Sequence, residues 1–195
     1  MKQQITVSQY RNIDLTILAV VMAVAQVLIH FAVSSWFPEQ LFVVSPVAIV
    51  VALVMIRWNG WAVIHSILGG LIYAALSGGS VQHYLIFGAG NAFAMLALIL
   101  LKHPGKEKVR LNPVYTLLFA FSVQMLMLLG RAAVAAMLGF ERAALLGFLT
   151  TDSLSILFTM VGLWSIRRMD GLFEDQIHYL LRINQERSVE GREQM

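Results

Sequence analysis

Apolar residues form six long stretches along this chain, and short polar or basic segments separate them. A helix crosses the ~30 Å hydrocarbon core of a bilayer with about 20 mostly apolar residues. The pattern therefore predicts six transmembrane helices, of which the second and third are short for a perpendicular crossing. The predicted spans cover about residues 13–33, 41–56, 61–76, 83–101, 112–138 and 144–166.

The stretch 112–138 carries two polar residues, Gln124 and Arg131, in an otherwise apolar run. An arginine near the centre of a membrane helix costs at least ~2.5–3.5 kcal/mol on insertion scales, so it needs a partner or a water-filled pocket. Residues seven apart lie on one face of a helix. We therefore expect the other helices to be arranged around this polar stripe.

Composition narrows the class of protein. The chain has 195 residues, of which 58% are hydrophobic and 13% charged, and its mean hydropathy is +0.74. These values favour an all-α integral membrane protein, a compact bundle of six transmembrane helices, over a soluble domain. The sequence has no cysteine, which excludes a disulfide framework and thiol catalysis. We expect no enzyme activity, metal, cofactor or nucleic-acid partner.

Basic residues predict the orientation. Twelve of the fourteen lysines and arginines fall on one side of the predicted helices, most densely in the loop 102–110. The positive-inside rule places that side in the cytoplasm. We therefore expect a multi-pass protein of a bacterial-type plasma (inner) membrane, with both termini cytoplasmic.

The C-terminal part of the chain has a different pattern. Residues 1–168 make up the predicted membrane domain, and residues 169–195 form a cytoplasmic tail. Apolar residues recur at helical spacing between Asp170 and Asn184, which predicts an amphipathic helix that lies on the membrane or against a partner, followed by a disordered end. Its apolar face would hold Phe173, Ile177, Leu180, Leu181 and Asn184.

Several polar residues are predicted to share one layer near the outer loops. Arg131 and Asp152 fall at similar depth on adjacent antiparallel spans, so an ion pair between them is expected. Asp152, Ser155 and Thr159 follow one face of the last span. The fourth span adds Tyr84, Phe87 and Asn91, and the first adds Gln26 and His30.

Two interpretations of this layer remain open. In the first it is a solute pocket, where Arg131 holds an anionic group, Asp152 orients Arg131 or takes a cation, and aromatic rings stack on the ligand. In the second, Arg131 and Asp152 form a structural pair, and Tyr84 and Trp36 are interface anchors. The candidate binding residues are Arg131, Asp152, Asn91, Gln124, Thr151, Ser155, Tyr84 and Trp36.

A family resemblance adds to this hypothesis. The segment Ala19-Val20-Val21-Met22-Ala23 is similar to the AxxxA docking motif of the S (substrate-binding) components of energy-coupling factor (ECF) type ABC transporters. The chain also resembles them over about 11–168 in size, span count and outward pocket. The resemblance implies uptake of a small vitamin-like micronutrient. It further implies a coupling transmembrane (T) subunit that docks at Ala19 and Ala23, and two cytosolic ATPases.

The resemblance also implies site residues. The family binds its ligand with the outer halves of spans 4 to 6, which matches Asn91, Arg131 and Asp152, and more loosely Trp36 and Gln82. Ala19 and Ala23 share a helix face with Gln26 and His30, so that face cannot easily serve both docking and binding.

Two other functions compete with this one. A membrane scaffold or morphogenesis protein of the rod-shape-determining type has similar size and span count, and its function would reside in the tail and the basic loop. A standalone oligomeric channel or carrier is disfavoured, because the spans carry no ring of charges.

Overall fold

The computed structural model describes residues 6–37 and 42–193. Within them the chain forms helices joined by turns and short extended segments, with no strand. The α-helices are α1 (Val7–Trp36), α2 (Val47–Trp58), α3 (Ala62–Leu76), α4 (Val81–Ala92), α5 (Ala97–Lys102), α6 (Lys106–Leu111), α7 (Pro113–Met137), α8 (Arg142–Thr151), α9 (Ser153–Ile166) and α10 (Gln176–Glu193). Two 3-10 helices, η1 (Asn59–Trp61) and η2 (Phe93–Leu96), lie between them.

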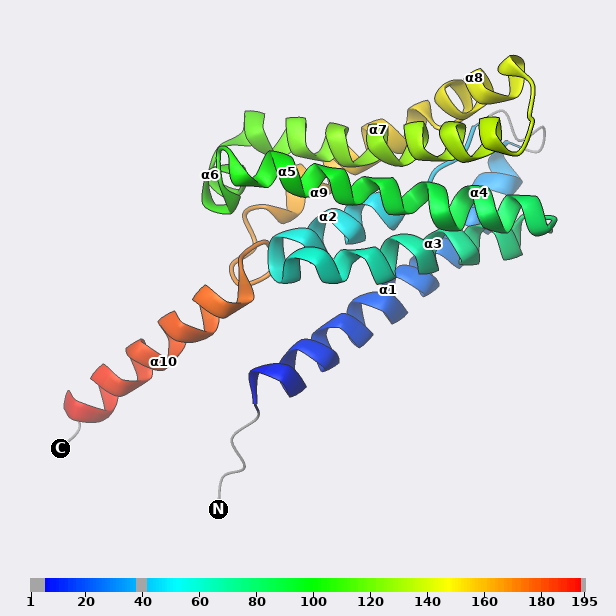
Figure 1. Cartoon of the computed structure of the whole chain (residues 1–195). Helices are drawn as coiled ribbons and strands as arrows, with labels where there is room; N and C mark the ends of the chain where they lie inside the picture. The colour runs from blue at the N-terminus through cyan, green and yellow to red at the C-terminus, as the bar shows by residue number, and fades with distance from the viewer. Residues whose placement is uncertain (1–5, 38–41, 194–195) are drawn as a thin grey trace.

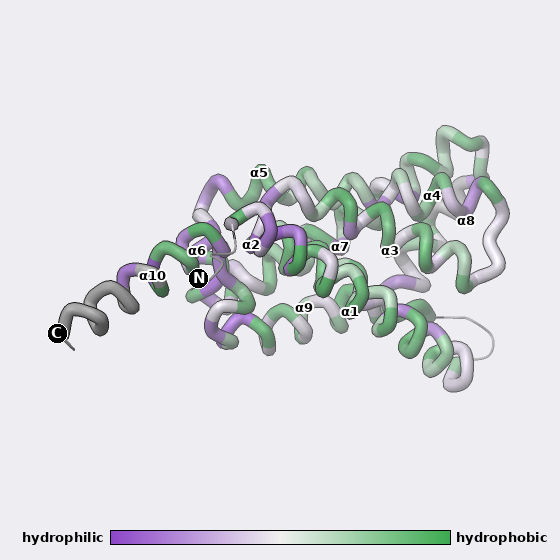
Figure 2. The backbone as a smooth tube through the Cα atoms, turned by 90° about the horizontal axis from the view of Figure 1, so that it is seen from below, coloured by the Kyte–Doolittle hydropathy of each residue, from purple (hydrophilic) through white to green (hydrophobic). Residues whose placement is uncertain are grey.

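The long helices lie alongside one another, so the molecule has two distinct ends (Figure 1). The short helix α6 lies at one end together with the beginnings of α1 and α10, and α8 lies at the other (Figure 1). We call these the α6 end and the α8 end. Hydrophilic residues gather at the α6 end, and the helices between the two ends are mostly hydrophobic (Figure 2).

Five segments are long and apolar enough to cross a membrane, which supports the predicted all-helical multi-pass protein. They are Val7–Trp36, Val47–Leu76, Val81–Lys102, Pro113–Met137 and Leu146–Ile166. The predicted count of six is not confirmed. The second and third predicted spans correspond to α2, η1 and α3, which follow one another directly and make up one 30-residue candidate, Val47–Leu76. That segment reverses at η1, where Asn59 has a φ of 54°, so α2 and α3 run antiparallel (Figure 1).

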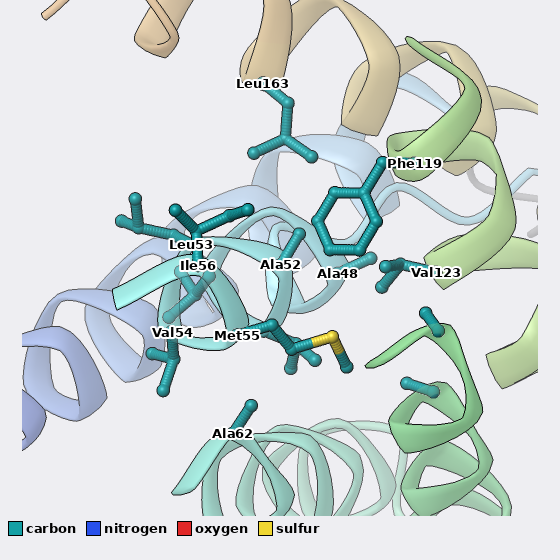
Figure 3. Packing of buried hydrophobic residues seen from close by; sticks show 14 of the residues in the cluster. Ala48, Ala52, Leu53, Val54, Met55, Ile56, Ala62, Phe119, Val123 and Leu163 are labelled. Carbon is teal, nitrogen blue, oxygen red and sulfur yellow. The ribbon is translucent and has the colours of Figure 1, made fainter. Parts of the chain in front are cut away.

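Helix α2 is the most enclosed part of the bundle. All of its residues except Ile49 are buried, because the sequence VAIVVALVMIRW offers apolar side chains on every face. Leu163 of α9 and Phe119 of α7 face its alanines in Figure 3. Helix α7, the predicted central helix, packs against α2 and also against α4, α8 and α9, so the other helices are arranged around it as expected.

Two predicted spans have altered boundaries because distant backbone segments pair. The second was expected from residue 41, but α2 begins at Val47, after Pro46. The preceding residues are not helical: the Val43 amide donates to the Thr151 carbonyl at 2.8 Å, and the Ser155 hydroxyl donates to the Val43 carbonyl at 2.8 Å. The last predicted span is correspondingly interrupted at Asp152, between α8 and α9.

An ion pair at the α6 end connects three segments. Arg57 at the end of α2 is buried and forms an ion pair with Asp14 of α1 at 2.6 Å. Its Nη1 also donates to the carbonyl oxygens of Gly171 and Leu172, at 2.6 and 2.8 Å, and the Trp58 indole donates to Asp14. These bonds fix the turn after α9 against the main bundle.

The C-terminal helix begins later than expected. The amphipathic pattern predicted a helix from residue 170, but α10 begins at Gln176. Phe173 is fully buried in the core, whereas Ile177 and Leu181 are exposed, so these three residues do not form one shared face. The expected disorder after Asn184 is wrong for most of that segment, because α10 continues to Glu193. The side chain of Asn184 lies outside what the structure describes.

Candidate functional site

The predicted ion pair between Arg131 of α7 and Asp152 is confirmed. Both side chains are buried, and Arg131 Nη1 donates to Asp152 Oδ2 at 2.5 Å. Arg131 Nε donates to Asn91 Oδ1 of α4 at 2.7 Å, and the guanidinium carbon lies 4.8 Å from the centre of the Phe87 ring. A carboxylate, an amide and an aromatic face thus surround one buried cation.

Glycines bring the helices of this site together. A Cβ atom at Gly90 of α4 would lie 2.6 Å from the Arg131 Cα. A Cβ at Gly130 of α7 would overlap the Gly90 carbonyl oxygen and lie 2.6 Å from the Phe93 Cβ. Gly90 and Gly130 therefore let α4 and α7 approach closely, while Gly88 faces Leu71 of α3.

Hydrogen bonds connect the ion pair to the extended segment before α2. Ser155 lies 3.5 Å from Asp152 Oδ1, and its hydroxyl oxygen accepts from the Ser45 amide at 3.2 Å. The Ser45 hydroxyl donates to Gln26 of α1 at 2.8 Å. Four separate segments of the chain are joined in this way around the break at Asp152.

A cavity of about 160 Å³ opens beside this network, and we call it the Tyr73 cavity. Residues of α1, of the extended segment and of the end of α3 line it, together with Thr151 at the end of α8. The Tyr73 ring lies 4.6 Å from the Phe87 ring, and Phe87 in turn lies against Arg131. The lining residues are His30, Val33, Ser34, Phe37, Phe42, Val43, Val44, Tyr73, Ser77 and Thr151.

The remaining predicted site residues fall in other places. Gln124 is buried and accepts a hydrogen bond from Thr159 at 3.2 Å, which forms a separate polar contact between α7 and α9. Tyr84 and Trp36 are exposed, the latter by 75%, and neither lines the Tyr73 cavity. The structure therefore brings together Arg131, Asp152, Asn91, Ser155 and Thr151.

The two proposed docking alanines lie at the margin of the buried face of α1. Ala19 and Ala23 are half-buried, next to the fully buried Met22 and Gln26. His30 is half-buried and lines the Tyr73 cavity. The expected conflict on this face is thus partly resolved, because Gln26 and His30 point toward the interior while the alanines lie at its edge.

Sequence reasoning missed the cavity-lining residues Tyr73, Val43 and Val44. Pro46 was the only signal for the extended segment, since a proline disfavours helix at the residue before it. Nothing local to the sequence indicated that this segment would meet the end of α8. In the part of the chain that the structure describes, no three His, Asp or Glu side chains are placed to hold a metal ion.

Comparisons of the chain with models of protein families, with curated proteins and with solved structures each found no match.

Proposed function

We propose that this chain is a membrane-embedded solute-binding subunit that takes up a small micronutrient and is energised by partner proteins. The supporting observation is that the extended segment 42–45 before α2 meets the break between α8 and α9 at Asp152, beside the Tyr73 cavity. Non-helical backbone at membrane depth is tolerated where it is buried in protein or lines a cavity. In many transporters such discontinuous helices form the substrate site.

In this proposal the solute occupies the Tyr73 cavity. At about 160 Å³ the cavity is smaller than the ~300–1,000 Å³ typical of drug-sized ligand pockets, which favours a small molecule. Its polar lining groups include His30, Ser34 and Thr151. These groups suit a solute with hydrogen-bonding or anionic character.

In this proposal the Arg131–Asp152 pair lies behind Tyr73 and Thr151, which line the cavity. A guanidinium has five N–H donors, and the bonds to Asn91 and Asp152 use two of them. Arg131 therefore retains donors for an anionic group that reaches past Tyr73 and Thr151. Asp152 holds the guanidinium in place through its ion pair.

The proposed topology has six spans, with both termini in the cytoplasm. The antiparallel arms α2 and α3 would each cross most of the membrane, and the basic loop 102–110 lies at the α6 end together with the beginnings of α1 and α10 (Figure 1). A bacterial-type plasma membrane fits the same charge asymmetry. This topology is the one expected of an ECF S component.

The proposed partners are a coupling T subunit and two ATPases. The residues Ile17, Val20, Val24 and Leu28 of α1 are all more than half exposed. Ala19 and Ala23 lie at the edge of that exposed apolar surface, where small side chains let another helix approach closely. A T subunit docked there would leave the Tyr73 cavity free.

A cavity-filling variant tests the proposal. Thermal unfolding of the purified protein is measured against a panel of small carboxylated and phosphorylated micronutrients. We expect at least one compound to raise the melting temperature, because a ligand that binds only the folded state stabilises it. Ser34→Phe, which fills the cavity, should abolish the shift, and Ser35→Phe, an exposed neighbour on α1, should retain it. A shift that survives Ser34→Phe would exclude this cavity as the site.

One observation favours the second candidate, a scaffold protein. Lys106 and Arg110 of the basic loop form ion pairs with Asp175 and Glu174, at 2.5 and 2.6 Å, so the tail and the loop form one continuous surface. A scaffold would use this surface, and deletion of the chain beyond Gln176, which keeps the buried Phe173 and the carbonyl partners of Arg57, would abolish its activity. A transporter subunit should retain solute binding after the same deletion.

A further inference from the structure

A second cavity, of about 270 Å³, lies at the α6 end between the last turn of α6 and the end of α9. Arg110, Leu111, Arg167, Arg168, Met169 and Asp170 line it. We call it the arginine cavity. It is distant from the Tyr73 cavity, and no residue lines both.

The arginine cavity has an excess of positive charge. Arg110 forms an ion pair with Glu174 at 2.6 Å, and Asp170 pairs with Arg182 at 3.3 Å. Arg167 and Arg168 form no ion pair with any residue that the structure describes. Two guanidinium groups therefore lack a counter-charge within the described chain.

Arg167 also has an unused donor. Its Nη1 donates to the Leu111 carbonyl at 3.2 Å, but its Nε is buried and has no hydrogen-bond partner among the described residues. A buried donor without an acceptor is destabilising, and more so when it is charged. An acceptor from outside the chain would satisfy it.

The surroundings of the cavity indicate where that acceptor comes from. Leu111, Val114 and Met169 are each more than half exposed, and Trp164 is 46% exposed. These residues continue the apolar outer surface of α7 and α9, which are candidate spans. Tryptophan is enriched where a membrane meets water. The cavity thus lies where an apolar, lipid-facing surface ends and charged loops begin.

We propose that the arginine cavity binds the phosphate of an anionic phospholipid headgroup. Arg167 and Arg168 would hold the phosphate oxygens, since a guanidinium binds phosphate through paired N–H donors. Leu111 and Met169 would contact the adjoining glycerol and acyl chains. Basic pockets between transmembrane helices on the cytoplasmic side commonly bind lipid headgroups in this way. The inference needs a membrane around the bundle, but it is independent of the proposed solute.

Native mass spectrometry with defined lipids tests the site. The full-length protein in mild detergent is titrated with phosphatidylglycerol or with phosphatidylcholine of the same acyl chains. We expect discrete phosphatidylglycerol adducts, at least about tenfold weaker in Arg167→Gln/Arg168→Gln, a factor that corresponds to ~1.4 kcal/mol. Lys102→Gln/Lys108→Gln removes two exposed charges near the same end and should leave the adducts unchanged. An equal loss in both double variants would show non-specific attraction and overturn the proposal.

Two further measurements separate lipid binding from the binding of a soluble phosphate and from an effect on folding. If inorganic phosphate forms its own adduct, loses it in Arg167→Gln/Arg168→Gln and excludes phosphatidylglycerol, the site takes a soluble phosphate and the lipid proposal is wrong. Arg168→Gln alone removes a side chain with no hydrogen bond or ion pair to a described residue, so this variant is expected to fold. It should still weaken the phosphatidylglycerol adducts, and an unchanged adduct level would also overturn the proposal.

Discussion

Arg131 shows how a long apolar helix accommodates a buried cation. The Asp152 carboxylate neutralises its charge, the Asn91 amide accepts a second hydrogen bond, and the Phe87 ring covers one face of the guanidinium. Removal of one partner of such a pair leaves the other charge buried and uncompensated, which is more costly than removal of both. A variant that removes only Arg131 should therefore be less stable than a variant that replaces both Arg131 and Asp152.

Arg131→Ala is expected to destabilise the protein by about 3–5 kcal/mol, because Asp152 then remains buried without a counter-charge. Arg131→Met/Asp152→Leu should recover most of that loss, since apolar side chains of similar size replace the pair. Unfolding by SDS titration in mixed micelles measures both. If the single variant is as stable as the natural sequence, Arg131 is not held as the structure describes.

Gly130→Ala tests the close approach of α4 and α7. The added methyl group would overlap the Gly90 carbonyl and the Phe93 side chain, so the helices must separate, at a cost of about 1–3 kcal/mol for overpacking. Gly147→Ala in α8 is the matched control, because no atom lies within 4 Å of its added Cβ. Thermal unfolding of both variants measures the difference, and an equally stable Gly130→Ala protein would contradict the described packing.

Sequence reasoning identified the residues of the Arg131–Asp152 ion pair but not those of the Arg57–Asp14 ion pair. Arg131 and Asp152 were predictable partners because their helices are antiparallel and a short loop joins them, which places them at one depth. Asp14 and Arg57 are 43 residues apart, and no periodicity relates them. Arg57 was interpreted only as a loop charge that reports orientation. Its buried contacts depend on how α1 and the turn after α9 pack.

Continuous helices were predicted well, and interrupted ones were not. The stretch 112–138 became α7, Pro113–Met137, with the Asn112 side chain capping its first turn. The helix expected at 13–33 is longer, because Thr6 and Gln9 form a capping box that starts α1 at Val7. The break at Asp152 was missed because it depends on Val43, more than a hundred residues earlier.

The attachment of α10 to the basic loop predicts a dependence on pH. Burial raises the pKa of Asp175, but the hydrogen bond and charge of Lys106, with the backbone amides of His178 and Ile177, outweigh it and lower the pKa below its usual value. A carboxyl group with a lowered pKa stabilises the folded state fully above its ordinary pKa of about 3.9. That contribution is lost as the pH falls through the lowered pKa.

Spin labels on Lys108→Cys/Leu181→Cys, two exposed positions, measure this attachment by pulsed EPR. We expect a narrow distance distribution at neutral pH that broadens only below about pH 4. Asp175→Asn should broaden it at neutral pH, whereas Glu107→Gln, an exposed carboxylate in the same loop, should not. A narrow distribution in Asp175→Asn at neutral pH would show that the ion pair with Lys106 does not hold the tail.

The whole molecule has one strongly basic end, which predicts its orientation in the membrane. The natural chain has no cysteine, so Lys108→Cys and Glu141→Cys each provide a single labelling site, one at either end. In intact cells, an impermeant maleimide should label Glu141→Cys but not Lys108→Cys, since the basic loop is expected to face the cytoplasm. After permeabilisation both should react. Labelling of Lys108→Cys in intact cells would reverse the proposed topology.

Native mass spectrometry of the gently purified protein tests whether a solute binds in the Tyr73 cavity. The natural sequence should carry a discrete small-molecule mass in addition to any lipid. That mass should disappear in Ser34→Phe and persist in Ser35→Phe. Protein that remains empty after exposure to cell extract, or a bound mass that Ser34→Phe retains, would contradict the account.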